Sequence, residues 1–286
     1  MTEFIRSIAI LLMSTCLMQG AWAQFNVSGP GFLPDENGTN LDDPQAKKGT
    51  LKGATATVVK DCAECPEMVV IPAGNFVMGS ERNIRGAKPL HTVTIRSFLI
   101  SKVEITQKQW FGVMGTNPSR FGLCGADCPV DNVSWNDTQQ FIAKLNQRTG
   151  QKYRLPSEAE WEYTARAGTR SEWSFGDDES TLGDYAWYNG NSGGKPQVVG
   201  QKLPNAFGLF DIHGNVAEWV EDCWHENYNG APADGSPWTT GCTIIFHILR
   251  GGSWKGNARF LSSALRYSDH PDNRSDGYGF RLARDL

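Results

Sequence analysis

The pattern of apolar and polar residues predicts short strands ahead of the first helix. Residues 68–71 are continuously apolar, residues 91–95 alternate with a period of two, and residues 98–100 are apolar again. Short runs of these kinds favour β-strands, and their order indicates a hairpin or meander. Residues 24–60 hold clusters of Gly, Pro, Asp and Asn with hardly any apolar periodicity, so we predict an N-terminal arm there.

Helical spacing follows in three segments. These are residues 106–112, residues 134–147, and a segment that begins at Ser157. The third opens with a capping box, in which Ser157 precedes Glu160 by three positions. Beyond it, Gly, Asn, Asp and Trp dominate, and no second linker or internal repeat is visible. We therefore predict one α+β domain over residues 61–286.

The charge balance excludes a nucleic-acid partner. The chain holds 27 Lys and Arg against 31 Asp and Glu, a net charge of −4, whereas nucleic-acid binding needs clustered excess cation to displace counterions from phosphates. Its 40% apolar and 20% charged residues are typical of a globular protein. Its 31 Gly and 10 Trp favour short elements, tight turns and large aromatic core residues.

The first 23 residues are typical of a secretory signal peptide. A short segment holding Arg6 precedes an apolar stretch over residues 8–18, and Ala21-Trp22-Ala23 forms a small-x-small cleavage site. The apolar stretch is about half the length of a spanning helix, which disfavours a membrane anchor. We predict export, cleavage after Ala23, and no membrane insertion of the mature chain.

Cleavage would remove Cys16 and leave six of the seven cysteines. They occur as three local pairs: Cys62 and Cys65, Cys124 and Cys128, and Cys223 and Cys242. An even number in an exported chain favours disulfides, and we predict these three pairs, although six cysteines allow other connectivities. Two alternatives stay open, namely a redox-active C-x-x-C at the first pair and a zinc site built from four cysteines.

Six motifs occur one after another along the chain, in an order that is typical of one family. They are EMVVIPAGNFVMGS from Glu67, VEIT from Val103, PVDNVSW from Pro129, RLPSEAEWEY from Arg154, NAFGLFDIHGNVAEW from Asn205, and LRGGSW from Leu249 with GFR from Gly279. Together they resemble the formylglycine-generating enzyme family, also called the sulfatase-modifying-factor domain, across about residues 66–286. The resemblance implies an α+β fold of that type, an elaborated C-type-lectin-like arrangement with little regular secondary structure.

Most of the charged motif residues are expected to be structural. We predict that Arg154, Glu160, Trp161 and Glu162 form a buried network of ion pairs and hydrogen bonds, because charges survive burial only when they are partnered. Trp219, Trp254 and Phe280 are expected in the core.

A calcium site is the metal site that the resemblance implies. Its ligands would be the side chains of Asp211 and Glu218 and the backbone carbonyls of Gly214 and Val216, which are the hard oxygen donors that Ca²⁺ requires. The alternative is that Asp211 caps a turn and Glu218 is satisfied within the protein. Full coordination by protein would leave no open position, so the predicted role of this Ca²⁺ is structural.

The chain departs from the family at the position of its chemistry. The family holds copper(I) between two cysteines that follow the Gly-Gly-Ser-aromatic motif, and this chain has Gly256 and Leu261 at those positions. We therefore expect no copper and no formylglycine-generating activity. The helical domain and the His-x-x-x-His-x-Glu site of the iron-dependent branch are absent from the sequence as well.

Among members that lack these cysteines, the chain resembles the periplasmic branch of pyoverdine maturation. That resemblance implies a periplasmic oxidoreductase that converts dihydropyoverdine, a peptide siderophore precursor, to the fluorescent pyoverdine chromophore. Its electron acceptor and any redox cofactor are not evident from the sequence. The alternative is a non-catalytic module of the same fold that binds a ligand or serves as a scaffold.

The family's cleft maps onto residues near the substituted cysteines. Acid, base or charge-stabilising roles are predicted for Lys255, His270 and Arg259, and substrate binding for Ser253, Trp254, Gly256, Asn257 and Tyr267. A glycine in place of a thiol leaves room for a flat aromatic ligand between Trp254 and Tyr267. The alternative is that Arg259 and Arg266 pair with Asp269, Asp272 or Asp276 to fix a loop.

Overall fold

The computed structural model describes residues 57–242 and 245–286. The predicted signal peptide and residues 24–56 of the predicted arm lie outside this range. The end of the arm lies inside it, because Val58–Val59 form strand β1, which pairs antiparallel with Met68–Ile71. The folded part therefore begins within the segment that the composition assigned to the arm.

A five-stranded sheet organises one part of the described chain, in the order β1-β2-β5-β11-β6. Its other strands are β2 (Met68–Ile71), β5 (Phe98–Ser101), β6 (Tyr153–Arg154) and β11 (Ala283–Asp285). Neighbouring strands pair antiparallel, and β11 lies between β5 and β6. The predicted strands at 68–71 and 98–100 are confirmed, while β6 and β11 are too short to show a period in the sequence.

A second sheet has four strands in the order β10-β7-β8-β9, and the predicted site residues lie on or next to its strands. The strands are β7 (Ala217–Cys223), β8 (His247–Arg250), β9 (Tyr267–Asp269) and β10 (Tyr278–Gly279), and β10 runs parallel to β7. A separate hairpin joins β3 (Gly74–Met78) to β4 (His91–Ile95). The sequence predicted β4 but not β3, whose residues alternate poorly.

Three helices begin where their caps predict. They are α1 (Gln107–Met114), α2 (Trp135–Thr149) and α3 (Glu158–Arg166), and each opens with a complete capping box whose first residue is Thr106, Ser134 or Ser157. Short turns complete the helical part: α4 (Leu182–Tyr185) and the 3₁₀ segments η1 (Gly122–Cys124), η2 (Glu179–Thr181) and η3 (Ala258–Phe260). Among the described residues, no helix has the length and apolarity that a membrane span requires.

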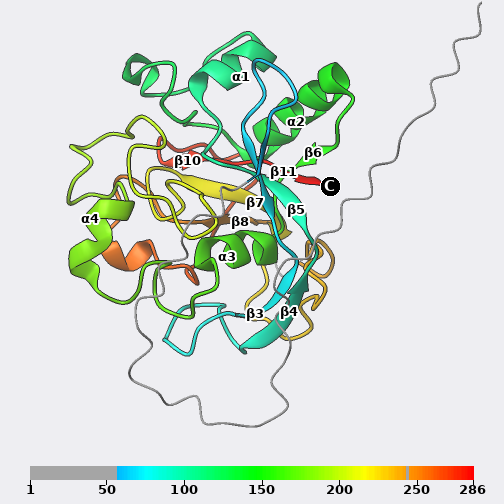
Figure 1. The fold of residues 1–286 in the computed structure, drawn as a ribbon, viewed down its shortest axis with the longest axis vertical. Coiled ribbons are helices and arrows are strands. Elements are labelled where there is room, and N and C mark those ends of the chain that lie inside the picture. Colours follow the sequence, from blue (N-terminus) through cyan, green and yellow to red (C-terminus); the bar gives the residue numbers. More distant parts are fainter. Residues whose placement is uncertain (1–56, 243–244) are drawn as a thin grey trace, which may run out of the picture. The chain divides into compact units, whose positions relative to one another are not determined.

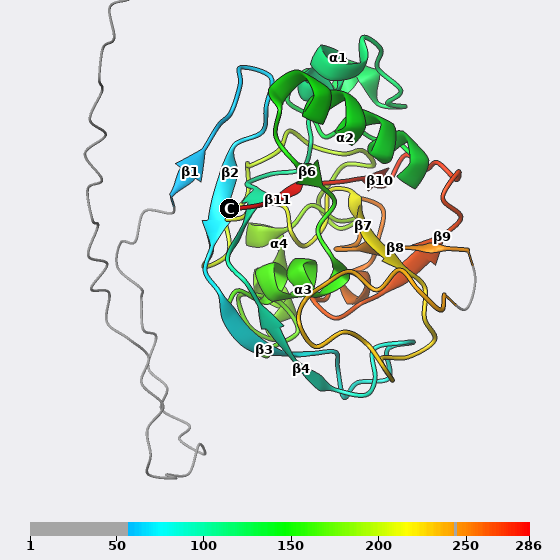
Figure 2. The same ribbon diagram turned by 90° about the vertical axis from the view of Figure 1, so that its right-hand side faces the viewer.

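Helix α3 lies in the middle of the folded domain. In Figures 1 and 2, α1 and α2 lie at one end, the β3–β4 hairpin lies at the opposite end, and α3 is between them. All nine residues of α3 are buried, including its charged side chains. The sequence around it must therefore supply partners for these charges.

Large aromatic side chains fill the core, as the Trp and Phe content predicted. Trp110 stacks on Phe141 with ring centroids 5.2 Å apart, and both rings meet the edge of Phe280. Trp219 and Phe280 are fully buried, as predicted. Trp254, which was also expected in the core, is only half-buried.

Three disulfides staple the loops. They join Cys62 to Cys65, Cys124 to Cys128, and Cys223 to Cys242. The predicted local pairing is confirmed. All six of these cysteines are bonded in pairs. The structure therefore offers no free thiolate for the zinc site, and the C-x-x-C pair is present as a disulfide.

Candidate functional site

The buried charges of α3 are neutralised by arginines from three other segments. Arg154 binds Glu160 through two hydrogen bonds of 2.6 and 2.8 Å. Glu162 binds Arg250 at 2.5 Å and Arg166 at 2.9 Å. Glu158 makes a bidentate pair with Arg266 through contacts of 2.7 and 2.9 Å. The predicted structural network is confirmed, and it is larger than the sequence indicated.

The row Arg166–Glu162–Arg250 joins the linings of two cavities. Arg166 lines one of them and Arg250 lines the other. Glu162 joins the two arginines, and the side chains of Glu162 and Arg250 are fully buried. This row of charges is therefore a wall that both cavities share.

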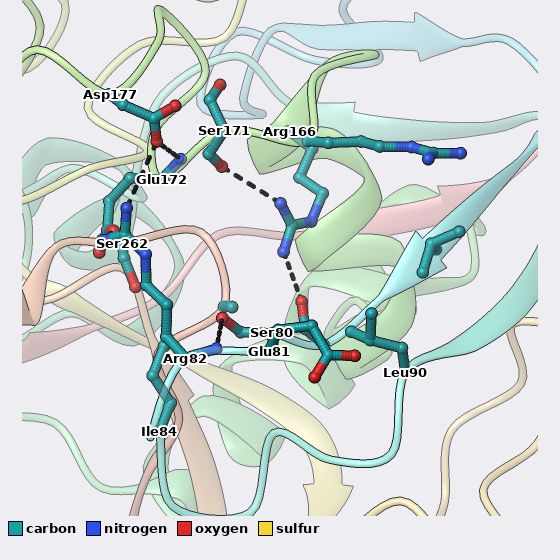
Figure 3. Close-up of a pocket in the computed structure, with 14 residues that line it drawn as sticks. Ser80, Glu81, Arg82, Ile84, Leu90, Arg166, Ser171, Glu172, Asp177 and Ser262 are labelled. Carbon is teal, nitrogen blue, oxygen red and sulfur yellow. Dashed lines mark hydrogen bonds and ion pairs between the residues drawn. The ribbon is translucent and has the colours of Figure 1, made fainter. Parts of the chain in front are cut away.

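The first cavity, of about 360 Å³, is lined mainly by polar and charged side chains, and we call it the polar cavity. Four of its charged residues, Arg82, Arg166, Glu172 and Asp177, bind one another or the backbone, as Figure 3 shows. Arg82 pairs with Glu172 and lies 3.6 Å from Asp177. Arg166 uses its guanidinium on Glu162 and on the carbonyls of Gly79 and Ser171. These contacts hold loops together.

The second cavity, of about 370 Å³, is lined by residues of β8, β9 and β10 and of the loop that follows β8, and we call it the aromatic pocket. Ser253, Lys255, Gly256 and Tyr267 line it, so four of the eight predicted site residues come together here. Tyr267 faces Tyr278 with ring centroids 6.2 Å apart. Phe260 and Tyr267, 40% and 52% exposed, form an apolar rim that a planar ligand could cover.

Lys255 is held at the edge of this pocket. Its ammonium donates to Asp276 at 2.6 Å and to Ser275 at 2.9 Å. Ser275 also lines the pocket, whereas Asp276 is not part of the lining and binds Arg120 at 3.5 Å as well. A charge placed in this way can attract an anionic or electron-rich ligand while its own position stays fixed.

The structure places the other four predicted residues outside the pocket lining. Trp254 donates its indole N–H to the carbonyl of Asp276 and meets the edge of Phe121. Asn257 binds Asn189, and the guanidinium of Arg259 lies over the ring of Phe260 at 4.7 Å. The site predicted between Trp254 and Tyr267 is therefore not formed, and Tyr267 packs instead against Tyr278 with the two rings tilted by 54°.

His270 and Arg266 also differ from expectation. His270 faces Asp272, with Nδ1 accepting from the backbone N–H of that residue at 3.3 Å. Arg266 is buried against Glu158. Within the described residues, neither Arg266 nor Arg259 forms the loop-fixing ion pair with Asp269, Asp272 or Asp276 that was the alternative.

Sequence reasoning missed Tyr278. This residue lines the pocket, and its hydroxyl binds the carboxylate of Asp269. Its hydroxyl donates to Asp269 Oδ2 at 3.0 Å. The other oxygen of Asp269 accepts from the backbone of His270 and from Asn273. Burial, together with Tyr267 and the charge of Asp269, raises the pKa of Tyr278 well above its usual range. Its position between Gly277 and Gly279, just ahead of a family motif, was the available signal.

Of the two side chains predicted to bind calcium, Glu218 is already engaged by other groups of the protein. Both oxygens of Glu218 bind Arg281, at 2.6 and 2.7 Å, and one also accepts from Trp161. Asp211 accepts from the backbone of Gly200, while its Oδ1 is buried without a partner. Burial raises the pKa of Asp211 to about 6. Glu218 is therefore committed to an ion pair, and calcium at Asp211 stays a prediction.

Residues 54–286 match the sulfatase-modifying factor enzyme 1-like domain. The chain belongs to this family. The match covers both sheets, the α3 network and the aromatic pocket. The α+β fold of the formylglycine-generating enzyme type, related to the C-type-lectin-like fold, is therefore confirmed.

The relatives in this family have names that imply different functions. The chain is 30% identical over 239 residues to chaperone protein LppX of Paenibacillus barcinonensis, covering 66% of this chain and 78% of the relative. It is 28% identical over 288 residues to a formylglycine-generating enzyme of Streptomyces coelicolor, covering 76% and 88%. The solved structure of PvdO from Pseudomonas aeruginosa superposes with a TM-score of 0.74 at 38% identity, covering 81% and 98%. Family membership therefore gives the fold, and the site must indicate the activity.

At the two positions mapped to the family's copper-binding cysteines, the structure has no sulfur. Leu261 is fully buried and packs with Trp173, Leu182 and Ala258. Gly256 lines the pocket, and a Cβ built there would lie 3.3 Å from the carbonyl oxygen of Ser253 and 3.5 Å from Leu261. The missing side chain thus widens the aromatic pocket and leaves no thiol in its lining.

Proposed function

We propose that this protein is a periplasmic oxidoreductase of siderophore maturation, which oxidises dihydropyoverdine to the pyoverdine chromophore. The observation that carries the proposal is the aromatic pocket, in which two tyrosines flank a cavity of about 370 Å³ beside Gly256. The similarity to PvdO over 81% of the chain supports the same assignment. The predicted signal peptide would deliver the protein to the periplasm.

The pocket suits a flat, electron-rich ring. Tyr267, Tyr278 and Phe260 offer ring faces and edges against which an aromatic ligand can pack. Lys255 supplies a positive charge at the edge, where phenolic oxygens of a catechol-type ring could accept its N–H. Ser253 and Ser275 add polar groups to the lining, which would orient the ring.

The oxidation removes two electrons and two protons from the fused ring. In the proposed reaction dioxygen accepts both electrons and both protons and becomes hydrogen peroxide. Tyr278 serves as the proton relay: its oxygen accepts a proton from the ring while its own hydroxyl proton passes to Asp269, 3.0 Å away. Because its raised pKa keeps the phenol neutral, Tyr278 acts by relay and not as a phenolate.

Formylglycine generation lies outside this proposal. That chemistry needs a pair of thiolates for copper(I), and Gly256 and Leu261 occupy the mapped positions. We therefore expect no conversion of a Cys-x-Pro-x-Arg peptide to the aldehyde and no stoichiometric copper in the purified protein.

The test is turnover of dihydropyoverdine under air. The purified protein should raise chromophore absorbance and oxygen uptake above the protein-free rate, with one hydrogen peroxide formed per chromophore. Tyr278→Phe should lower kcat by about 100-fold, because it removes the relaying hydroxyl and keeps the ring. Tyr185→Phe, which changes a tyrosine stacked on Phe175 away from the pocket, is the matched control and should keep full activity.

One observation favours the alternative of a non-catalytic binding module. The ammonium of Lys255 is already bound to Asp276 and Ser275, which suits a group that positions a ligand better than one that exchanges protons. Stoichiometric binding of dihydropyoverdine without acceleration of its oxidation would establish this alternative and overturn the oxidoreductase.

A further inference from the structure

We propose a second subsite for the same substrate, in which a basic groove next to the aromatic pocket binds an anionic group of the peptide attached to the chromophore. The groove has a volume of about 460 Å³ and is lined by residues 119–124 and Lys195. This inference rests on the proposed function, since it extends the binding of the same peptide siderophore precursor.

The groove is next to the aromatic pocket because the two share a carboxylate. Asp276 binds Lys255, which lines the pocket, at 2.6 Å and Arg120, which lines the groove, at 3.5 Å. The rings of Trp254 and Phe121 meet edge to face with centroids 5.4 Å apart, which joins the pocket loop to the groove loop. A chromophore in the pocket can therefore extend its peptide directly over the groove.

The charges of the groove favour an anion. Arg120 and Lys195 line it, and no Asp or Glu does so among the described residues. Arg120 is 72% exposed and shares Asp276 with Lys255, and Asp131 binds the backbone of the same loop, so two carboxylates face the three cations Arg120, Lys195 and Lys255. Lys195 forms no ion pair within the described part of the chain. The local excess of positive charge can bind a carboxylate of a peptide.

The groove loop is fixed in place before any ligand arrives. Asp131 accepts from the backbone N–H groups of Arg120 and Phe121, and Gln107 donates to the carbonyl of Phe121. The disulfide of Cys124 with Cys128 closes the loop, and the Cys124 sulfur contacts the carbonyl of Pro196, the residue after Lys195. A rigid loop loses little conformational entropy on binding.

The loop also exposes an apolar side chain that nothing in the described chain covers. Leu123 is fully exposed at 104% of its reference area. An apolar residue beside two cations suits a peptide that carries both an aliphatic portion and a negative charge. A substrate that consists of a chromophore alone would reach neither Leu123 nor Lys195.

The test compares dihydropyoverdine that carries its complete peptide with the chromophore fragment from which the peptide has been removed. Binding is measured by equilibrium dialysis, which does not depend on turnover. We expect the wild-type protein to bind the complete compound about tenfold more tightly than the fragment, and we expect raised salt to reduce that difference. Arg120→Ala combined with Lys195→Ala should abolish it without weakening binding of the fragment.

Two further variants separate the groove from indirect effects. Lys195→Glu leaves Arg120 and Asp276 unchanged and should weaken binding of the complete compound alone. Lys144→Ala with Lys152→Ala removes two exposed lysines elsewhere and should change neither affinity. Equal loss of both ligands in the Arg120 and Lys195 variants would overturn the subsite, as would unchanged affinity for the complete compound.

The outcomes also distinguish the subsite from the oxidation. Binding of both compounds with the expected difference but without turnover would overturn the oxidoreductase and leave the subsite established. Turnover of both compounds with equal affinities would establish the oxidation and overturn the subsite. No binding of either compound would overturn both.

Discussion

The polar cavity and the aromatic pocket are nearly equal in volume, at about 360 and about 370 Å³, but their linings differ in chemistry. In the polar cavity, the guanidinium of Arg166 donates hydrogen bonds to three partners, and Arg82 is paired with Glu172. In the aromatic pocket, the ring faces of Tyr267 and Phe260 are exposed. Volume alone therefore does not select a functional site, whereas groups left available to a ligand do.

The wall that the two cavities share, Arg166–Glu162–Arg250, is expected to contribute most to stability. Removing Glu162 by Glu162→Ala should lower the free energy of unfolding by about 3–5 kcal/mol, because Arg250 would remain buried with only the more distant carboxylate of Glu158, 3.7 Å away. The Gly79 backbone N–H and Arg166 would lose the same acceptor. Chemical denaturation measures this change.

Glu179→Ala provides the matched control for that loss. Glu179 is an exposed glutamate at the start of η2, and its removal should change stability only slightly. A loss of similar size in both variants, or none in Glu162→Ala, would contradict the role of the wall.

The groove loop predicts a dependence on pH. Burial raises the pKa of Asp131 to about 6 from its usual value of 3.8. The folded state then binds more protons than the unfolded state between about pH 4 and pH 6, so this group makes stability fall as pH rises through that window. We expect a fall of about 1–3 kcal/mol across this window, since a pKa difference of one corresponds to about 1.4 kcal/mol.

The contribution of Asp131 is isolated by comparison with Asp131→Asn. Other buried carboxylates, such as Asp211 and Asp222, also have raised pKa values and act in the same direction. The difference between the stability–pH curves of the wild type and the variant should therefore slope between about pH 4 and pH 6 and be flat above it. A flat difference across the whole range would contradict the raised pKa.

The smallest effect is expected in the polar cavity itself. Arg82→Ala breaks the pair with Glu172, but the arginine side chain is 62% exposed. Surface pairs of this kind contribute less than about 1 kcal/mol, and turnover of dihydropyoverdine should not change. A large loss of turnover would show that the polar cavity, and not only the aromatic pocket, takes part in the reaction.

The sequence predicted what local chemistry determines. Thr106, Ser134 and Ser157 cap their helices through contacts within a few residues, so the helix starts could be read directly. Cys62 and Cys65, like the other cysteine pairs, are close in sequence as well. Strand β3 was missed because its burial depends on its partner β4 and not on its own pattern.

The site was predicted only in part, because its geometry depends on distant segments. Ser253, Lys255 and Gly256 lie on one loop beside a family motif, and they remain together in the pocket. Tyr278 reaches the same pocket on β10, which pairs with β7 far away in sequence. No spacing within the last 40 residues shows which of Tyr278 and His270 points inward, so residue type favoured His270.

Strand β11 has a consequence for the order of assembly. It is the last strand along the chain, yet it lies between β5 and β6 and provides the pairing for both. The five-stranded sheet therefore stays in two pieces until residues 283–285 have been synthesised. Closure of this kind makes the sheet one of the last parts of the domain to reach its final shape.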